Sequence, residues 1–303
     1  MSIVVTGAGG YVGGRLVDHL RHAGETVWPM VRRDAPWILQ ARRPIDLVTV
    51  DMDTLVGRLE GHDAVVHLAG ANEVVFGRDP DRALADTVVA TQRLAQAARR
   101  AGVPRFVYLS TIHVYGGRTD DGVVHEGIVP EPRHPYAIAR LAGEHLAAGL
   151  GPDHVVSLRL TNAVGYIPDR RIERGTLVAN ELCARAIAGE PLVLRSSGHD
   201  LRDFVAMEDA CRVIGAAAAG ALPTGTYNLG SGTSTRIIDL AHLVADAAEE
   251  NHLRRPEVVA PPHEGPEPAP FRVDVGRLAA HVPPPATDLR ATLATSLFMM
   301  RPV

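Results

Sequence analysis

The chain has 303 residues, of which 46% are hydrophobic, and it carries a formal net charge of −4. This composition suits one or two globular domains and excludes a disordered polymer, a collagen and a disulfide-stapled miniature scaffold. All 31 basic residues are arginine, so the chain contains no lysine. Chemistry that needs a lysine amine, such as a Schiff base or a Walker A loop, is therefore excluded. The scattered arginines and the slight acidity also disfavour a nucleic-acid-binding surface.

The cysteines and the N-terminus bear on the compartment. The only two cysteines, Cys183 and Cys211, have no metal-ligand spacing, which fits a reduced, cytoplasmic environment. The chain enters its first apolar segment almost at once, without a basic flank or a long apolar run. We therefore expect neither a signal peptide nor a membrane span.

The first half of the chain alternates short apolar runs with longer helical stretches. Strands are expected at Ser2–Thr6, Thr26–Val31, Leu47–Val50, Ala64–Leu68, Arg105–Ser110 and His154–Leu160. Two of the intervening helices end at Gly24 and Gly102, where a glycine closes a helix. Because these strands are apolar nearly throughout, they should be buried on both faces. Residues 1–160 are thus predicted to form an α/β domain with a parallel sheet wrapped by helices.

The pattern loosens after about Thr161. Helices are expected at Leu177–Ala188, Met207–Ala219, Ile237–Glu250 and Thr287–Met299. The stretch Pro256–Pro270 contains six prolines and is predicted to be a loop. Residues 161–303 should form mainly a smaller substrate-binding lobe, with some segments returning to the first sheet.

A glycine-rich turn follows the first strand directly and opens the first helix. It places Gly7, Gly10 and Gly13 at the spacing G-x-x-G-x-x-G. Glycine allows a tight turn and lets the backbone approach a pyrophosphate, which then lies at a helix N-terminus. The strand–turn–helix context favours cofactor binding over a purely structural turn.

Several segments together resemble the extended short-chain dehydrogenase/reductase family, whose members include nucleotide-sugar epimerases, dehydratases and ketoreductases. The resembling segments are, in chain order, "TGAGGYVG", "HLAG", "YLSTIHVYGG", "HPYAIARLAGEHLAA", "LRLTNAVG", "LRDFVAMEDA" and "YNLGSG". The resemblance implies a Rossmann-type doubly wound sheet, a nicotinamide cofactor and a nucleoside-diphosphate sugar substrate. It places the cofactor against Gly7, Gly10, Tyr11, Val12, Gly13, Asp51, Met52, Leu68, Ala69 and Gly70.

The end of the second strand bears on the choice of cofactor. NAD-binding members of the family usually have an acidic residue there, whereas this chain has Val31, followed by Arg32 and Arg33. Without that carboxylate, two guanidiniums can hold a 2′-phosphate, so NADP is favoured. The alternative is that both arginines are solvated and Asp34 turns inward to serve NAD.

The resemblance assigns Thr111 and Tyr136 to the family's catalytic hydroxyl pair. Tyr136 would exchange a proton with the sugar while hydride passes to or from the nicotinamide, and Thr111 would bind the substrate oxygen. The family's lysine is replaced by Arg140. Arg140 would contact the cofactor and supply a positive charge that favours the phenolate, although its planar group has a different shape. Either catalysis persists with arginine, which we favour, or the protein is a catalytically impaired cofactor-binding regulator or redox sensor.

The residues after Thr111 discriminate between reactions. The family's 4,6-dehydratases carry an Asp-Glu pair there, whereas this chain has Ile112 and His113. Ile112 cannot transfer protons, so a dehydratase is disfavoured, and 4-epimerisation or reduction of a 4-keto sugar is expected. His113 could act as an acid or base, or simply form the wall of the pocket.

On the substrate side, the resemblance assigns Asn162 and Arg202 to the diphosphate region, with Arg272 as a further candidate. The alternative for Arg202 is an internal ion pair with Asp203 or Asp209. Two departures, Thr87 in place of an asparagine and the missing proline in "NAVGYIP", leave the sugar and the base open.

Three further expectations concern metals, partners and the class of substrate. No histidine shows ligand spacing such as H-E-x-x-H, so no metal site is predicted. The helix over Tyr136–Gly149 is a candidate for pairing two subunits into a homodimer. A reductase of a small non-nucleotide carbonyl compound, the third functional hypothesis, would not require Arg202.

Overall fold

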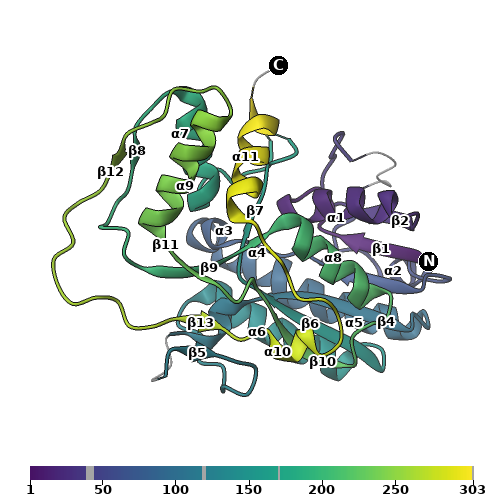
Figure 1. Ribbon diagram of the computed structural model, residues 1–303. Helices are drawn as coiled ribbons and strands as arrows, with labels where there is room; N and C mark the ends of the chain where they lie inside the picture. Colours follow the sequence, from purple (N-terminus) through teal and green to yellow (C-terminus); the bar gives the residue numbers. More distant parts are fainter. Residues whose placement is uncertain (39–43, 118–120, 170, 302–303) are drawn as a thin grey trace.

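The computed structural model describes residues 1–38, 44–117, 121–169 and 171–301 (Figure 1). Six parallel strands form its central sheet, in the order β10-β6-β4-β3-β1-β2. These strands are β1 (Ser2–Thr6), β2 (Thr26–Met30), β3 (Ala64–His67), β4 (Arg105–Thr111), β6 (His154–Leu160) and β10 (Gly225–Leu229). Alternate residues bury opposite faces, as Val4 and Val5 do. The predicted Rossmann-type parallel sheet is confirmed.

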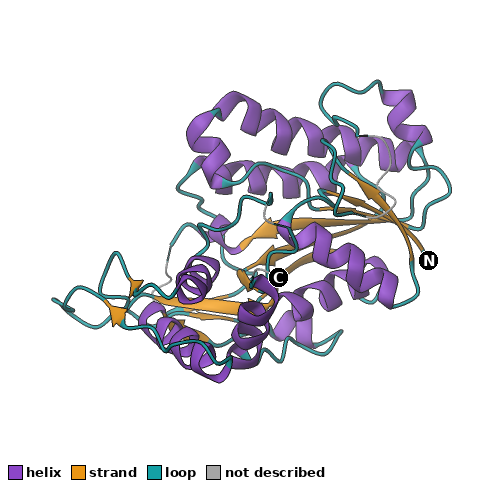
Figure 2. Cartoon of the chain, turned by 90° about the horizontal axis from the view of Figure 1, so that it is seen from above, coloured by secondary structure: helices purple, strands orange, loops and turns teal. Residues whose placement is uncertain are grey.

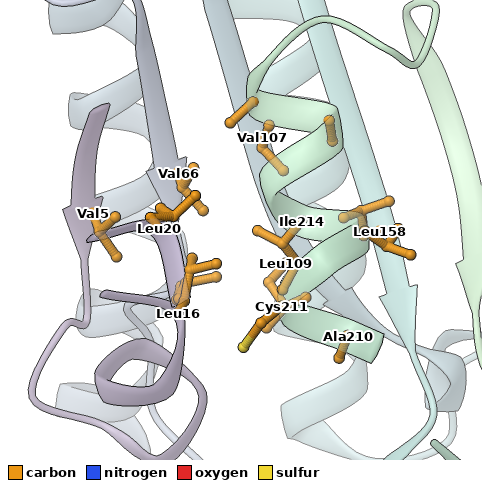
Figure 3. Packing of buried hydrophobic residues seen from close by; sticks show 14 of the residues in the cluster. Val5, Leu16, Leu20, Val66, Val107, Leu109, Leu158, Ala210, Cys211 and Ile214 are labelled. Atoms are coloured by element: carbon orange, nitrogen blue, oxygen red, sulfur yellow. The ribbon is translucent and has the colours of Figure 1, made fainter. Parts of the chain in front are cut away.

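Helices cover both faces of this sheet (Figure 2). One layer contains α1 (Tyr11–His22) and α8 (Met207–Ala218), and the other contains α2 (Met52–Gly57), α5 (Ala90–Arg100) and α6 (Pro135–Leu150). Figure 3 shows the first layer, where Leu16 of α1 and Ile214 of α8 meet side chains of the strands. Gly24 and Gly102 follow α1 and α5 with φ of +84° and +69°, as the predicted helix ends require.

Short elements connect these layers. They are α3 (Glu73–Arg78), α4 (Pro80–Leu84), the π-helical turn η1 (Ala85–Val89), the 3₁₀ turn η2 (Ile112–Tyr115), β5 (Val123–Val124) and α10 (Gly276–Ala279). A proline at the first helical position and the Asp79 side chain, which accepts from the backbone N–H of Arg82, start α4.

A second hydrophobic core lies beside the first. It is built from α7 (Val178–Ala188), α9 (Ile237–Glu250) and α11 (Leu289–Met300), packed on the sheet β11-β9-β7. These strands are β7 (Asn162–Val164), β9 (Leu201–Ala206) and β11 (Ser234–Arg236). Two small sheets pair β8 (Leu192–Val193) with β12 (Val258–Val259), and β5 with β13 (Arg272–Val273). Although α8 and β10 follow residue 161, where the smaller lobe was predicted to begin, they pack in the first core.

The predicted strand at Leu47–Val50 is wrong, because this segment forms a turn. The Asp46 carboxylate accepts from the backbone N–H of Val48 at 2.9 Å, which folds the chain back locally. Arg93 donates to the carbonyls of Leu47 and Val50, so a side chain satisfies groups that a neighbouring strand would otherwise pair. In consequence β2 is an edge strand of the central sheet.

Within the described ranges, no helix is both long and apolar enough to cross a membrane.

Candidate active site

A cavity of about 750 Å³ lies at the carboxyl ends of the central strands. Its wall includes Gly10 after β1, Arg32 after β2, Ala69 after β3 and Thr111 at the end of β4. The second core contributes Asn162 of β7 and the segment that follows it. Ligands of open parallel sheets bind at this edge, so the cavity is the candidate active site.

The glycine-rich turn and the N-terminus of α1 form one end of the cavity. Gly7 has a φ of +69°, and a Cβ atom on Gly13 would lie 2.1 Å from the Gly7 carbonyl oxygen, so neither position tolerates a side chain. The helix N-cap, Gly10, supplies no side-chain hydrogen bond, and the first turn contains no acidic residue. The positive end of α1 therefore faces the cavity uncapped, as a pyrophosphate site requires.

A buried hydrogen-bond chain fixes the loop after β3. The hydroxyl of Thr91 donates to the Thr87 carbonyl at 2.5 Å, so its oxygen accepts from His67 Nε2 at 2.9 Å. His67 Nδ1 must then accept from the Thr6 hydroxyl at 2.7 Å. Burial, reinforced by the charge of Arg140, lowers the pKa of His67 to about 3. This imidazole is therefore a neutral link between β1, β3 and α5.

Thr87, the departure from the family's asparagine, has a clear structural role. It is fully buried in η1, and its hydroxyl accepts from the backbone N–H of Ala71 at 3.0 Å. The adjacent Gly70 has a φ of +149°, and a Cβ there would lie 2.9 Å from a terminal nitrogen of Arg140. The loop holding Leu68, Ala69 and Gly70 is thus shaped to admit a guanidinium, and all three residues line the cavity.

The two arginines after β2 differ in their interactions. Arg32 pairs with Asp86 of η1, a buried carboxylate that also binds Arg82 at 2.8 Å. Arg33 is exposed and lines the cavity together with Asp34. Arg33 is therefore the guanidinium more accessible to a ligand, because Arg32 already has a partner.

Asp51 and Met52 are not among the residues that line the cavity. The Asp51 side chain caps α2 by accepting from the Thr54 N–H at 2.8 Å, and Met52 packs against the core. The turn at Asp46 changes the path of the chain, so that Asp46, Leu47 and Val48 form the wall instead.

Thr111, Tyr136 and Arg140 all line the cavity. Arg140 is buried on α6, where NH1 donates to the Leu109 carbonyl at 3.2 Å, and its guanidinium carbon lies 5.5 Å from the Tyr136 ring centroid. Burial opposes the charge of Arg140, but interactions with Tyr136 and Tyr108 raise its pKa above the ordinary arginine value. A permanent cation therefore adjoins Tyr136, the residue to which the resemblance assigns acid and base chemistry.

Two histidines extend this group. His134 caps α6, its Nδ1 accepting from the Ala137 N–H at 3.4 Å, and its ring stacks on Tyr136 with 5.9 Å between centroids. His113 lies 5.7 Å from His134, also measured between centroids. His113 lines the cavity, and desolvation by the surrounding side chains, together with the charges of His134 and Arg202, lowers its pKa. Sequence spacing did not identify His134, since a histidine before Pro-Tyr is no recognised signal.

A buried ion pair connects to β4 at the residue before Thr111. Glu144 of α6 accepts from Arg159 of β6 through two bonds of 3.0 and 2.7 Å, and also from the Ser110 hydroxyl. Ser110 immediately precedes Thr111 at the end of β4. The pair thus ties α6, β4 and β6 together at the residue next to Thr111.

The predicted substrate residues separate into two groups. Asn162 lines the cavity, and its amide donates to the Asp203 carbonyl at 2.8 Å. Arg202 and Arg272 are not among the lining residues. Arg202 pairs loosely with Asp200 at 3.7 Å, not with Asp203 or Asp209, while Arg272 is exposed on β13.

Residues not predicted from the sequence also line the cavity. Arg171 lies over the Trp37 ring at 4.5 Å, and Arg174 approaches Glu73 at 3.5 Å. Each contact links the second half of the chain to the first across the cavity. No motif marks these residues, because each depends on a partner distant in sequence.

The cysteines take no part in this site. Cys183 and Cys211 are buried in the two cores, and burial raises the pKa of each thiol to about 12. Neither thiol is a reactive nucleophile.

Comparisons with known proteins agree with this geometry. GDP-6-deoxy-D-mannose reductase of Pseudomonas aeruginosa is 30% identical over 262 residues, which cover 82% of this chain and 80% of that protein. dTDP-glucose 4,6-dehydratase of Streptomyces niveus is 28% identical over 275 residues, which cover 80% and 76%.

Solved structures share the whole fold. MoeE5 in complex with UDP-glucose and NAD has a TM-score of 0.81 at 28% identity, covering 99% of this chain and 98% of that one. UDP-glucose 4-epimerase of Thermus thermophilus, in complex with NAD, has a TM-score of 0.78 at 26% identity over the same shares. The sequence profile of the NAD dependent epimerase/dehydratase family matches residues 3–230. The chain therefore belongs to the NAD dependent epimerase/dehydratase family, within the extended short-chain dehydrogenases/reductases.

Proposed function

We propose that this protein is an NADP-dependent reductase of a 4-keto nucleoside-diphosphate sugar. The observation that carries the choice of reduction is the end of β2, where Val31 replaces the usual acidic residue and exposed Arg33 lines the cavity. A guanidinium in this place favours a 2′-phosphate, and NADPH suits net reduction because the cofactor leaves oxidised. The similarity to a nucleotide-sugar reductase supports the same direction.

The residues present fit a nicotinamide dinucleotide. The uncapped N-terminus of α1 suits its pyrophosphate, and the loop from Leu68 to Gly70 borders the cavity beside Arg140. When bound, the cofactor supplies the hydride. Tyr136, Arg140 and the glycine-rich turn would hold it, and no lysine is needed for these contacts.

The reaction then depends on three side chains of the cavity. The Thr111 hydroxyl orients the substrate carbonyl by a hydrogen bond, and the Tyr136 hydroxyl donates the proton that the new alcohol requires. Arg140 stabilises the phenolate left on Tyr136, since a neighbouring cation favours the charged form. Ile112 offers no proton, which argues against elimination of water.

On the substrate side, we propose that Asn162 contacts the nucleotide-sugar diphosphate and that Arg202 and Arg272 approach it when the ligand binds. Arg202 would give up the loose pair with Asp200 and the hydrogen bond of 3.0 Å from its NH1 to the Leu201 carbonyl, and its charge already acts on His113. A guanidinium suits a diphosphate because it donates two parallel hydrogen bonds.

The second candidate is 4-epimerisation on retained NAD. It is favoured by the fold and identity shared with MoeE5, whose solved complexes contain NAD with UDP-glucose and with UDP-glucuronic acid. The pairing of Arg32 with Asp86, which leaves one guanidinium fewer for a 2′-phosphate, fits this candidate as well. The catalytically impaired regulator is not supported, because the relatives named above are enzymes.

The test compares cofactors and then substrates. Dissociation constants for NADPH and NADH are measured with wild type and with Arg33→Ala, and Arg78→Ala, which removes an exposed side chain at the end of α3, serves as control. We expect tighter NADPH binding that Arg33→Ala weakens roughly tenfold, the loss of about 1.4 kcal/mol that one charge-assisted contact supplies. Tighter NADH binding would refute the NADP assignment. Loss of NADPH absorbance in proportion to a 4-keto UDP-, dTDP- or GDP-sugar would establish reduction, whereas exchange of hydroxyl configuration without net oxidation would establish epimerisation.

We also propose that α6 pairs two copies of the chain. Ile138 on this helix is 50% exposed, which is unusual for a large apolar side chain on a helix that carries the active-site tyrosine. Gel filtration of Ile138→Glu should show a monomer where wild type elutes as a dimer. A wild type that elutes as a monomer would refute the pairing.

A further inference from the structure

Three ligand-type side chains cluster outside the cavity, where the proline-rich segment Pro256–Pro270, here called the strap, passes the start of β9. They are His199, His263 and Glu267, whose ligand atoms all lie within 4.8 Å of one another. The two imidazole rings stack with 3.9 Å between centroids. Figure 1 shows the part of the strap that follows β12 as the long loop running toward β13. We propose that His199, His263 and Glu267 bind a divalent cation of the zinc class.

Hydrogen bonds to the Nδ1 atoms orient the two histidine rings. His199 Nδ1 lies 3.2 Å from the Ser197 carbonyl oxygen, which only accepts, so this nitrogen carries the proton and Nε2 keeps its lone pair. His263 Nδ1 lies 3.3 Å from the hydroxyl of the same Ser197. Metal-binding histidines usually engage their second nitrogen in this way, which fixes the ring. One serine thus orients both rings: Nε2 of His199 keeps its lone pair, and Nε2 of His263 does so in the tautomer in which Nδ1 donates to the hydroxyl.

The cluster joins a fixed segment to the strap. Gly198 has a φ of +74°, and its carbonyl accepts from the Ile238 N–H at 2.9 Å, while the Asp200 carbonyl accepts from Ile237 at 3.2 Å. These bonds attach the backbone of His199 to the start of α9. His263 and Glu267 come from the strap, whose prolines restrict the conformations that binding must order.

The ligand types and spacing indicate which ion would bind. Two imidazole nitrogens and one carboxylate suit zinc, whereas magnesium and calcium prefer oxygen alone. Ligands around tetrahedral zinc are about 3.3 Å apart, given Zn–N distances of about 2.05 Å. The cluster must therefore contract by about 1.5 Å at most from its 4.8 Å span, which side-chain rotation on the strap allows. Water would complete the coordination.

One ion pair competes with a metal ion for Glu267. Arg236, at the start of α9, donates to Glu267 at 3.2 Å, and the two side chains are 41% and 64% exposed. Exposed pairs of this kind are weak, so a divalent ion displaces the guanidinium. Removing the charge of Arg236 should accordingly tighten metal binding, whereas removal of Glu267 should weaken it.

The proposal replaces the expectation that the chain has no metal site. A search for ligand spacing along the sequence fails here because the ligands come from two loops, one before β9 and one before β13. Occupation would tie the strap to the segment that leads into Arg202. The proposal is independent of the reaction catalysed in the cavity, since none of the three residues lines it.

The experiment measures zinc binding by the full chain. Protein freed of metal by a chelator is titrated with Zn²⁺ against a chromophoric zinc indicator, for wild type, His199→Gln, His263→Ala, Glu267→Gln, Arg236→Gln and His145→Ala. His145 is exposed on α6, away from the cluster, and serves as the matched control. Circular dichroism and the thermal midpoint without zinc establish that each variant is folded.

We expect one equivalent to bind to wild type and to His145→Ala. Either histidine variant should lose roughly ten- to a hundredfold in affinity, at least as much as the loss of a supporting residue costs. Zinc should raise the thermal midpoint of wild type but not of His263→Ala. The proposal is overturned if wild type binds no zinc, or if folded His199→Gln and His263→Ala bind it as tightly as His145→Ala does.

Discussion

The guanidinium carbon of Arg140 lies 5.5 Å from the ring centroid of Tyr136, and a hydrogen bond of 3.2 Å to the Leu109 carbonyl holds it there. Both residues are on the first two turns of α6, and Arg140 is buried. At the position to which the resemblance assigns the family's lysine, an arginine thus supplies a cation that cannot lose its proton. The protein keeps a charged partner for the tyrosine in a chain without a single lysine.

This arrangement predicts unequal effects of two substitutions. Tyr136→Phe should lower kcat by about two to four orders of magnitude, because the proton donor is removed. Arg140→Lys should stay within roughly tenfold of wild type or exceed it, since a cation remains beside the phenol. Steady-state rates with cofactor dissociation constants as a control separate lost chemistry from lost binding. Equal activity of Tyr136→Phe and wild type would contradict the assignment.

His67 predicts a pH dependence of stability. Its pKa in the folded protein is about 3, against 6.5 for the ordinary side chain, so between these values only the unfolded chain takes up the proton. The contribution of His67 is therefore complete above pH 6.5 and is lost as the pH falls toward 3, by up to about 1.4 kcal/mol per pH unit.

Urea unfolding of His67→Gln across this pH range should show a shallower decline than wild type, because glutamine does not titrate. His145→Gln, which replaces an exposed histidine on α6, should decline as wild type does. Parallel declines of wild type and His67→Gln would show that the buried imidazole is not held neutral.

The buried pair of Glu144 and Arg159 should be costly to break. Both side chains are 6% exposed, so Glu144→Ala leaves an unpaired buried guanidinium and should cost about 3–5 kcal/mol. Asp153→Ala breaks the pair with Arg99, in which Asp153 is 98% exposed, and should leave stability close to wild type. Equilibrium denaturation measures both, and similar losses for the two variants would contradict the structural role of the buried pair.

Local signals predicted most of the first domain. The apolar runs and the glycine positions at helix ends reflect backbone preferences and burial, which act over a few residues, so β1, β3, β4 and β6 lie where the sequence placed them. The prediction of a strand at Leu47–Val50 was wrong because the apolar pattern of this segment suits a strand as well as a turn. Its conformation depends on Asp46 and on Arg93, which is more than forty residues away. Because this segment forms a turn, Asp51 also lies away from the cavity, contrary to the prediction.

The residues of the candidate site also fall into those that the sequence predicted and those that only the structure revealed. Thr111, Tyr136 and Arg140 were predicted from short motifs on β4 and α6, and the fold places all three along the cavity. The pairing of Arg32 with Asp86 and the contact of Arg171 with Trp37 each join residues more than fifty positions apart. No local pattern encodes such pairs, so the state of Arg32 required the structure.

The most direct test of the account follows the hydride itself. Wild type and Tyr136→Phe are incubated with a 4-keto nucleoside-diphosphate sugar and NADPH deuterated at the transferable position of the nicotinamide, and the sugar is examined by mass spectrometry and NMR. The account predicts deuterium at C4 of the sugar formed by wild type and little product from Tyr136→Phe. A product without deuterium, or labelling at the same rate in both proteins, would contradict it.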